Sequence, residues 1–455
     1  MSKIYENSLA YLISKKYVNW SFKKFYKEVI VIGKENIPIN KPVIFAPNHL
    51  NALMDALAIL SLPPFRQVKV YLSRADIFKL PKPIVKFIHF TKIMPAYRMR
   101  DGFENLSKNK ESFSMADEVL LNGACMCMMP EGDQGLEHKI RPLVKGIFRI
   151  AFSAQQKMTD GKSVQIIPVG LNYGDFVKQG KHLIINIGKP INVASYYKDY
   201  EEKPSITINT IKNKLKEELE KLALHIDSEE YYDSFLTMIE VTNEQYLEWL
   251  GLKNNTYNLF VARQKAAENL RIGITEQTDI IEDLDKVCKK YKSSMQKIKF
   301  DFATFNKKVP TFTKNIFNYL TFIALLILAL PGILLNIIPY FITSQIPKLM
   351  KIKFEGFFSS VYYVAGIVLF PLFYLIQSLV LLSVFSIPLW YIFLALPAHY
   401  FLGKLSLHMK WKLQEIMQDI RYYIFAKSKK KRFDDLQTLR NTILKHAKYL
   451  YKHVK

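Results

Sequence analysis

Cysteine is scarce in this chain, which has three cysteines in 455 residues. A disulfide framework needs paired cysteines and an oxidising compartment, so the scarcity argues against one and suits a reducing environment. Cys125 and Cys127 lie two residues apart in a stretch that alternates as a strand would, which is not the spacing of a zinc or redox site. We therefore expect neither a disulfide scaffold nor a metal site.

The first 28 residues lack the uninterrupted apolar core of a signal peptide, because lysine, tyrosine, tryptophan and phenylalanine are mixed throughout. They predict an amphipathic helix that either covers a core or lies at a bilayer surface. Long apolar runs occur only late, at residues 316–343 and 357–402. A membrane-spanning helix needs roughly 20 apolar residues, so these runs predict an integral membrane protein with a large polar N-terminal portion.

Acidic residues are outnumbered, with 40 Asp and Glu against 64 Lys and Arg, a net charge of +24. The excess favours an anionic partner such as nucleic acid, acidic lipid headgroups or a phosphorylated substrate. Basic residues crowd the tail, where residues 427–432 suit anionic membrane lipids, and membrane tethering disfavours nucleic acid. The positive-inside tendency places the tail and the N-terminal domain on the cytoplasmic face, in a bacterium the face of the inner membrane.

Short apolar runs alternate with helical patterns from residue 29 to residue 226, which predicts an α/β domain with a mostly parallel sheet flanked by helices. The expected strands are 29–32, 43–46, 68–73, 92–95, 124–129, 165–171 and 183–187, and the expected helices are 51–61, 81–90, 103–122, 142–158 and 205–225.

Four further segments complete the predicted organisation: an N-terminal amphipathic helix over 1–28, a helical appendage over 227–310, a membrane section over 311–403 and a basic cytoplasmic tail over 404–455. A cytoplasmic location of both ends of the membrane section requires two or four crossings. Pro331 is expected to break the first apolar run into a hairpin or a re-entrant pair. The second run is long enough for two helices that turn near residues 383–386.

The stretch from Pro47 to Asp55 lies between a predicted strand and a predicted helix, where sites gather in α/β sheets. His49 is a ready proton acceptor near neutral pH, and Asp55 can orient its ring if the chain turns between them. On one continuous helix the two side chains would lie on different faces, so His49 should precede the helix and Asn51 should cap it. The alternative is a capped helix with a surface histidine.

Three more stretches carry polar or turn residues near strand ends. Arg98 and Arg100 follow a predicted strand, and arginine suits bidentate phosphate capture, although an ordinary basic loop has the same composition. Glu131 and Gly132 form a Pro-Glu-Gly turn that either binds substrate hydroxyls, orders cationic loops or is purely structural. The strand over 166–173 contains an early proline, and by itself it is structural.

In this order and spacing, the four stretches resemble the glycerolphosphate and lysophosphatidate O-acyltransferase family of phospholipid synthesis. The stretches are Asn48-His49 with Asp55, Pro95 to Arg98, Pro130-Glu131-Gly132 and Ile167-Pro168-Val169. The resemblance covers roughly residues 20–225. Five residues separate His49 from Asp55 where the commoner family pattern has four. With a Pro-Glu-Gly that lacks a following Thr or Ser, this looks like the branch of fungal dual-substrate glycerol-3-phosphate/dihydroxyacetone-phosphate acyltransferases and bacterial relatives.

The resemblance implies His49 as the general base and Asp55 as the residue that holds its imidazole. The expected substrate-binding residues are Asn48, Arg98, Arg100, Glu131, Gly132 and Lys145. It further implies acyl-CoA or acyl carrier protein as the acyl donor, a phosphorylated glycerol as the acceptor, and no cofactor. The sequence has no Gly-x-Ser-x-Gly elbow, so we expect direct attack by the acceptor hydroxyl on the thioester.

Three alternatives remain open at this point. The acceptor can be lysophosphatidate instead of glycerol 3-phosphate. The chain can be a non-enzymatic lipid-binding membrane protein on an inactive acyltransferase fold. A metal-dependent phosphoesterase built on His49 and Asp55 is the third alternative, for which the sequence offers too few clustered ligands.

Overall fold

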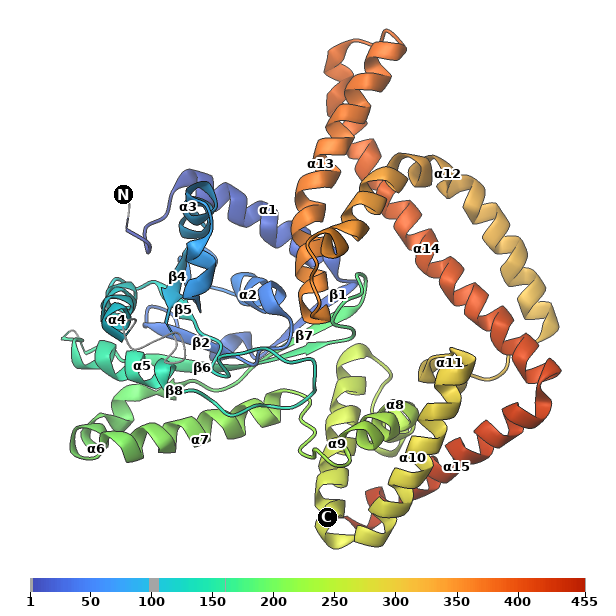
Figure 1. Cartoon of the computed structure of the whole chain (residues 1–455), viewed down its shortest axis with the longest axis horizontal. Coiled ribbons are helices and arrows are strands. Elements are labelled where there is room, and N and C mark those ends of the chain that lie inside the picture. Colours follow the sequence, from blue (N-terminus) through green and yellow to red (C-terminus); the bar gives the residue numbers. More distant parts are fainter. Residues whose placement is uncertain (1–2, 98–105, 160, 455) are drawn as a thin grey trace. The chain divides into compact units, whose positions relative to one another are not determined.

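The computed structural model describes residues 3–97, 106–159 and 161–454, and the chain divides into two compact units (Figure 1). We call them the α/β unit, which comprises Met1–His225 and Ile352–Tyr363, and the helical unit, which comprises Ile226–Lys351 and Val364–Lys455. The short second segment of the α/β unit begins after the first of two long apolar helices, Phe312–Leu349, and extends into the first turns of the second, Glu355–Val384.

A mixed sheet organises the α/β unit, with the strand order β1-β7-β6-β2-β5-β3-β4 and with β8 beside β6. Strands β2 to β6 pair in parallel, which confirms the predicted mostly parallel sheet. Strand β7 runs antiparallel to β6, because residues 174–181 join the two without the helical crossover that a parallel pair needs. The strands are β1 (Glu28–Ile32), β2 (Val43–Pro47), β3 (Lys69–Arg74), β4 (Ile93–Ala96), β5 (Cys125–Cys127), β6 (Gln165–Tyr173), β7 (His182–Ile187) and β8 (Ile191–Asn192).

Helices cover both faces of this sheet (Figure 1). The chain crosses from β2 to β4 in one direction and returns from β4 to β6 in the other, so right-handed crossovers place the connecting helices on opposite faces. One face carries α1 (Leu9–Phe25), α2 (Ala52–Leu60) and α3 (Lys82–Phe90), and the other carries α4 (Leu106–Leu121), α5 (Gly146–Gln156), α6 (Tyr197–Glu202) and α7 (Pro204–Leu222). Strands β2 and β6 are buried along their whole length, as strands covered on both faces should be.

Helix α7 ends directly against β6. A Cβ atom on Gly170 would lie 2.2 Å from the carbonyl oxygen of Leu222, so only glycine permits this approach. The same carbonyl accepts hydrogen bonds from the side-chain amides of Asn172 at 3.1 Å and Asn186 at 2.9 Å. The last turn of the helix is thus satisfied by the sheet on which it packs.

The predicted helical appendage is a bundle in the helical unit. Its helices are α8 (Tyr232–Trp249), α9 (Thr256–Glu276), α10 (Thr278–Ile298), α11 (Phe302–Asn306) and α15 (Lys430–His453). Helix α15 comes from the expected basic tail, yet Leu436, Ile443, Ala447 and Leu450 are buried, and the Tyr451 hydroxyl donates to the Trp249 carbonyl at 2.8 Å. The expected boundary between residues 403 and 404 also falls inside α14 (Ile392–Ser428). Part of the expected basic tail therefore packs on this bundle, because its apolar residues recur at helical spacing.

The predicted break at Pro331 is wrong, since α12 (Phe312–Leu349) is one continuous helix that contains Pro331, Pro339 and Pro347. A proline removes a backbone hydrogen bond four residues earlier, and the structure supplies a replacement at Pro339, where the Gln377 amide donates to the Leu335 carbonyl at 2.9 Å. Gln377 lies on α13 (Phe358–Val384), which follows the 3₁₀ turn Glu355–Phe357. The expected turn near 383–386 is present, because α13 ends at Val384 and α14 begins at Ile392.

In the part of the chain that the structure describes, two helices are long and apolar enough to cross a membrane, Phe312–Leu349 and Glu355–Val384. Their apolar windows are 17% and 11% buried, respectively, so they are not core helices of a globular domain. Length and composition favour association with a bilayer.

Candidate active site

The predicted motif lies at the carboxyl edge of the sheet, where β2, β5 and β6 end side by side. Asn48 anchors the motif there: its amide nitrogen donates to the Leu171 carbonyl at 3.2 Å, and its amide oxygen accepts from the Leu171 N–H at 2.6 Å. Asn48 is 1% exposed. Both polar atoms of the Asn48 side chain are used in these bonds, which join the end of β2 to β6. The geometry therefore gives no support to the predicted contact of Asn48 with substrate.

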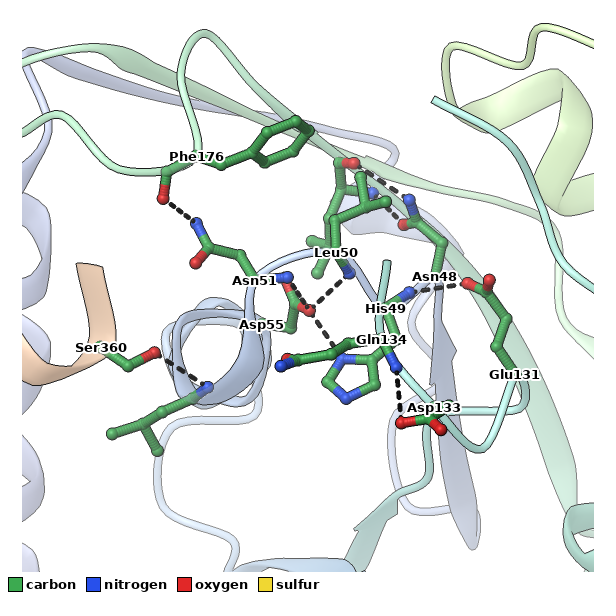
Figure 2. Close-up of polar contacts among 12 residues, drawn as sticks. Asn48, His49, Leu50, Asn51, Asp55, Glu131, Asp133, Gln134, Phe176 and Ser360 are labelled. Atoms are coloured by element: carbon green, nitrogen blue, oxygen red, sulfur yellow. Dashed lines mark hydrogen bonds and ion pairs between the residues drawn. The ribbon is translucent and has the colours of Figure 1, made fainter. Parts of the chain in front are cut away.

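His49 and Asp55 meet despite the additional residue between them (Figure 2). The imidazole Nδ1 lies 2.8 Å from Asp55 Oδ2. The same oxygen accepts the Leu50 N–H at 2.9 Å and the Asn51 N–H at 2.7 Å, so the intervening chain wraps around the carboxylate. This turn requires a φ of +43° at Ala52, a left-handed conformation that residues with a Cβ atom rarely adopt.

The second oxygen of Asp55 is also engaged. Tyr173, at the end of β6, donates its hydroxyl to Asp55 Oδ1 at 2.6 Å. Burial, together with the nearby charge of Asp55, raises the pKa of Tyr173 well above its ordinary value, so the hydroxyl stays protonated and remains a donor. Tyr173 was not among the predicted site residues, and its only sequence signal is its position at the end of the strand next to β2.

These contacts determine which nitrogen of the His49 imidazole carries the proton. An ionised carboxylate can only accept hydrogen bonds, so Nδ1 carries the hydrogen and Nε2 holds the free lone pair. The His49 side chain is 18% exposed, whereas Asp55 is fully buried. Across the part of the chain that the structure describes, no hydrogen bond engages Nε2. The pair can therefore accept a proton at Nε2 while Asp55 fixes the opposite nitrogen.

The main chain of His49 is held at its N–H, where Figure 2 shows the contact with Glu131, and at its carbonyl. Glu131 Oε1 accepts the His49 N–H at 2.7 Å, and Glu131 Oε2 accepts Arg141 Nε at 2.8 Å. Arg141 Nη2 in turn donates to the His49 carbonyl at 3.0 Å. The buried Glu131 carboxylate thus orients His49. The structure supports this positioning contact for Glu131, which the sequence had placed at the substrate. Arg141 was not among the predicted site residues, because no local pattern marks an arginine ten residues after the Pro-Glu-Gly turn.

The remaining predicted residues are less closely tied to the His–Asp pair. Gly132 has a φ of +71°, which favours glycine, and a Cβ there would lie 3.1 Å from a methyl of Val144. Lys145 is the next residue, exposed at the start of α5. Arg98 and Arg100 lie outside the described residues. Within the described ranges, no group of three or more His, Cys, Asp or Glu side chains is placed to hold a metal ion.

Comparison with known proteins adds three findings. Residues 28–172 match the model of a family described as Acyltransferase. Over 168 residues the chain is 27% identical to the 1-acyl-sn-glycerol-3-phosphate acyltransferase of Chlamydomonas reinhardtii, covering 36% of this chain and 45% of that protein. The crystal structure of the 1-acyl-sn-glycerophosphate acyltransferase PlsC of Thermotoga maritima aligns over 45% of this chain and 78% of that protein, at 19% identity and a TM-score of 0.31. The match to the Chlamydomonas protein thus spans less than half of that relative's length.

Proposed function

We propose that this chain, whose matches support an acyltransferase of the lysophosphatidate or glycerophosphate type, transfers a fatty acyl group from an acyl thioester to the hydroxyl of glycerol 3-phosphate or a related phosphorylated acceptor. One observation carries the proposal: His49 Nδ1 lies 2.8 Å from the buried Asp55, and both residues lie within the matched range. Acyl-CoA or acyl carrier protein is the donor.

In the mechanism that we infer, His49 Nε2 removes the proton of the acceptor hydroxyl as its oxygen attacks the thioester carbonyl carbon. The carbon–sulfur bond then breaks, and the thiolate leaves with the proton that His49 returns. Asp55 holds the ring and stabilises the imidazolium that forms between these steps. General-base assistance of this kind contributes about 10²–10⁴-fold in rate.

The acceptor has two candidates within this reaction. The name of the Chlamydomonas relative favours 1-acylglycerol 3-phosphate, that is, lysophosphatidate. The resemblance to the dual-substrate branch favours glycerol 3-phosphate and dihydroxyacetone phosphate. All three carry a phosphate, for which the proposed ligands are Arg98, Arg100 and Lys145. The two exposed apolar helices support work at a membrane, where an acylated product partitions, and the basic residues of the chain support its cytoplasmic face.

Turnover measured on full-length protein in lipid vesicles tests the proposal. Acyl-CoA is offered with each of the three acceptors, and His49→Ala is compared with wild type. We expect His49→Ala to lower kcat by at least about 100-fold while the protein stays folded and membrane-bound. His453→Ala, on the exposed end of α15, is the matched control and keeps full activity.

Two outcomes would contradict the proposal. Near-normal turnover of His49→Ala would remove the general base. Wild-type protein that transfers acyl groups to none of the three acceptors, from either acyl-CoA or acyl carrier protein, would favour a non-enzymatic lipid-binding role for the same fold. A chelator in the assay separates the phosphoesterase alternative, because the proposed transfer does not depend on a metal ion.

A further inference from the structure

The first turn of α13 and the residues before it belong to the α/β unit, although they lie far from it in sequence. Ser359 is 1% exposed and Ser360 is 7% exposed, so both hydroxyls are buried. Buried hydroxyls need partners. Both serines find them in the turn that joins His49 to Asp55.

Ser360 caps helix α2. The side chain of Asn51, the residue before α2, makes no capping bond to the helix. Instead, Ser360 Oγ accepts the Leu53 N–H at 3.2 Å (Figure 2). An N-cap side chain satisfies an N–H of the first helical turn that has no partner within the helix. Here the capping side chain belongs to Ser360, which lies 307 residues after Leu53 in the chain.

Ser359 holds the amide of Asn51. Its hydroxyl donates to Asn51 Oδ1 at 2.6 Å, and Asn51 Nδ2 donates to the Phe176 carbonyl at 3.1 Å. The next residue, Ala52, has the left-handed φ of +43°. Such a conformation persists only where its surroundings hold it. The two serines and Phe176 hold both sides of this residue.

Tyr363 anchors the same turn of α13 to α1. Its hydroxyl donates to the Val18 carbonyl at 2.9 Å and lies 2.7 Å from Ser21 Oγ. Its ring packs edge-on against Phe22 and Phe25, with centroid distances of 6.3 and 5.9 Å. Docking of this segment therefore has two independent attachments, one of them at the candidate active site.

We propose that Ser359 and Ser360 are positioning residues for the His49–Asp55 pair, and that the site is complete only when the first turn of α13 is docked on it. The inference rests on the proposed function. The serines fix the Asn51–Leu53 turn, this turn supplies the Leu50 and Asn51 N–H groups to Asp55, and Asp55 orients His49. The first turn of a helix that is long and apolar enough to cross a membrane thereby sets the geometry of the general base.

Kinetics of Ser359→Ala, Ser360→Ala and the double variant test the inference. We expect kcat to fall by about tenfold or more, because sub-ångström misplacement of a catalytic group is costly, while the KM for the acceptor changes less than about threefold. Ser360→Thr keeps the hydroxyl and retains most activity. Ser406→Ala is the matched control, since Ser406 is also buried but donates only to the Gly403 carbonyl of its own helix.

A double-mutant cycle separates positioning from general damage. If Ser360 acts through Asp55, Ser360→Ala has little further effect in the Asp55→Asn background, less than about twofold. The same fold-loss in both backgrounds would overturn the inference. Should Ser360→Ala fail to fold, Ser360→Cys carries the same cycle, because a thiol of similar size is a weak acceptor.

Hydrogen–deuterium exchange gives a readout that does not depend on turnover. Amides of residues 50–55 should exchange faster in Ser359→Ala and Ser360→Ala than in wild type, and at the wild-type rate in Ser406→Ala. Unchanged exchange, or full kcat in the serine variants, would overturn the positioning role while leaving the proposed function intact. Wild-type protein without any acyl transfer would instead remove the proposed function, and the positioning role with it.

Discussion

The α/β unit and the helical unit each bury an aspartate, and the two carboxylates have different surroundings. Asp55 accepts two backbone N–H groups, the Tyr173 hydroxyl and the His49 ring N–H. Asp285, on α10, accepts the Ser234 hydroxyl at 2.6 Å and pairs with Lys289 at 2.7 Å. Lys289 lies four residues along the same helix, and its side chain is largely exposed.

This difference separates a structural charge from a chemical one. A buried charge is expensive unless it is paired, and Lys289 supplies that pairing to Asp285 within one helix. Asp55 has no lysine or arginine partner among the described residues, and the group beside it that can become positive is the imidazole of His49. A carboxylate arranged in this way is stabilised most when the imidazolium forms, which is the condition for rate enhancement.

The largest expected difference between the two units is the one between Asp55→Asn and its counterpart in the helical unit, Asp285→Asn. We expect Asp55→Asn to lower kcat by about 10²–10⁴-fold, because an amide cannot hold the Nδ1–H tautomer or stabilise an imidazolium. Asp285→Asn should leave kcat within about twofold. Steady-state turnover of both variants in vesicles is the measurement. Equal losses in the two variants would show that the carboxylates do not differ in role.

A smaller difference is expected between two glutamate–arginine pairs of the described residues, Glu131–Arg141 in the α/β unit and Glu240–Arg263 in the helical unit. Glu131→Gln weakens the hold on the His49 main chain, and charge-assisted hydrogen bonds are worth about 1.5–3 kcal/mol, so we expect a loss of about 10- to 100-fold in kcat. Acceptor KM should change little. Glu240→Gln is the control, with unchanged kinetics. A selective rise in acceptor KM would instead place Glu131 at the substrate.

Local patterns in the sequence were enough for most of the fold. Strands β2 and β6 and the helix after His49 were predicted within a few residues, because apolar runs and helical periodicity are properties of neighbouring residues. The break predicted at Pro331 is absent; at Pro339 of the same helix, the hydrogen bond to Leu335 that the proline removes is replaced by one from Gln377, 42 residues from Leu335 on α13. The residues of α15 were assigned to a basic tail because their many charges drew attention away from the four apolar side chains, Leu436, Ile443, Ala447 and Leu450, that recur at helical spacing.

The sequence predicts the His49–Asp55 pair of the site, but not the residues that hold this pair in place. His49 and Asp55 are six residues apart, and a known motif carries both. Tyr173 is 118 residues from Asp55, Arg141 is 92 residues from His49, and Ser360 is 307 residues from Leu53. Contacts of this range follow from the packing of whole elements, and neither spacing nor composition encodes them in a single sequence.

Two lysines give the smallest expected effect and have pKa shifts of opposite sign. Burial lowers the pKa of Lys69 in β3 to about 7, with its ammonium held by the carbonyls of Leu62 and Pro64. The hydrogen bond to Asp285, on the exposed side of α10, raises the pKa of Lys289. Above pH 7 the unfolded chain, in which a lysine has a pKa of about 10.4, binds one more proton at Lys69 than the folded chain does. The free energy of unfolding should therefore rise with pH from this group, by up to about 1.4 kcal/mol per pH unit.

Urea unfolding of the α/β unit within the full-length protein, followed by pulse proteolysis at pH 7, 8 and 9, measures this slope. Lys69→Met should remove the rise that Lys69 contributes. Lys289→Met should leave it unchanged, because a raised pKa stabilises equally at every pH below the unfolded value and is lost only above it. A slope that is the same in wild type and Lys69→Met would mean that Lys69 keeps its proton in the folded state through pH 9. The carbonyls of Leu62 and Pro64 would then stabilise a buried ammonium as effectively as Asp285 stabilises an exposed one.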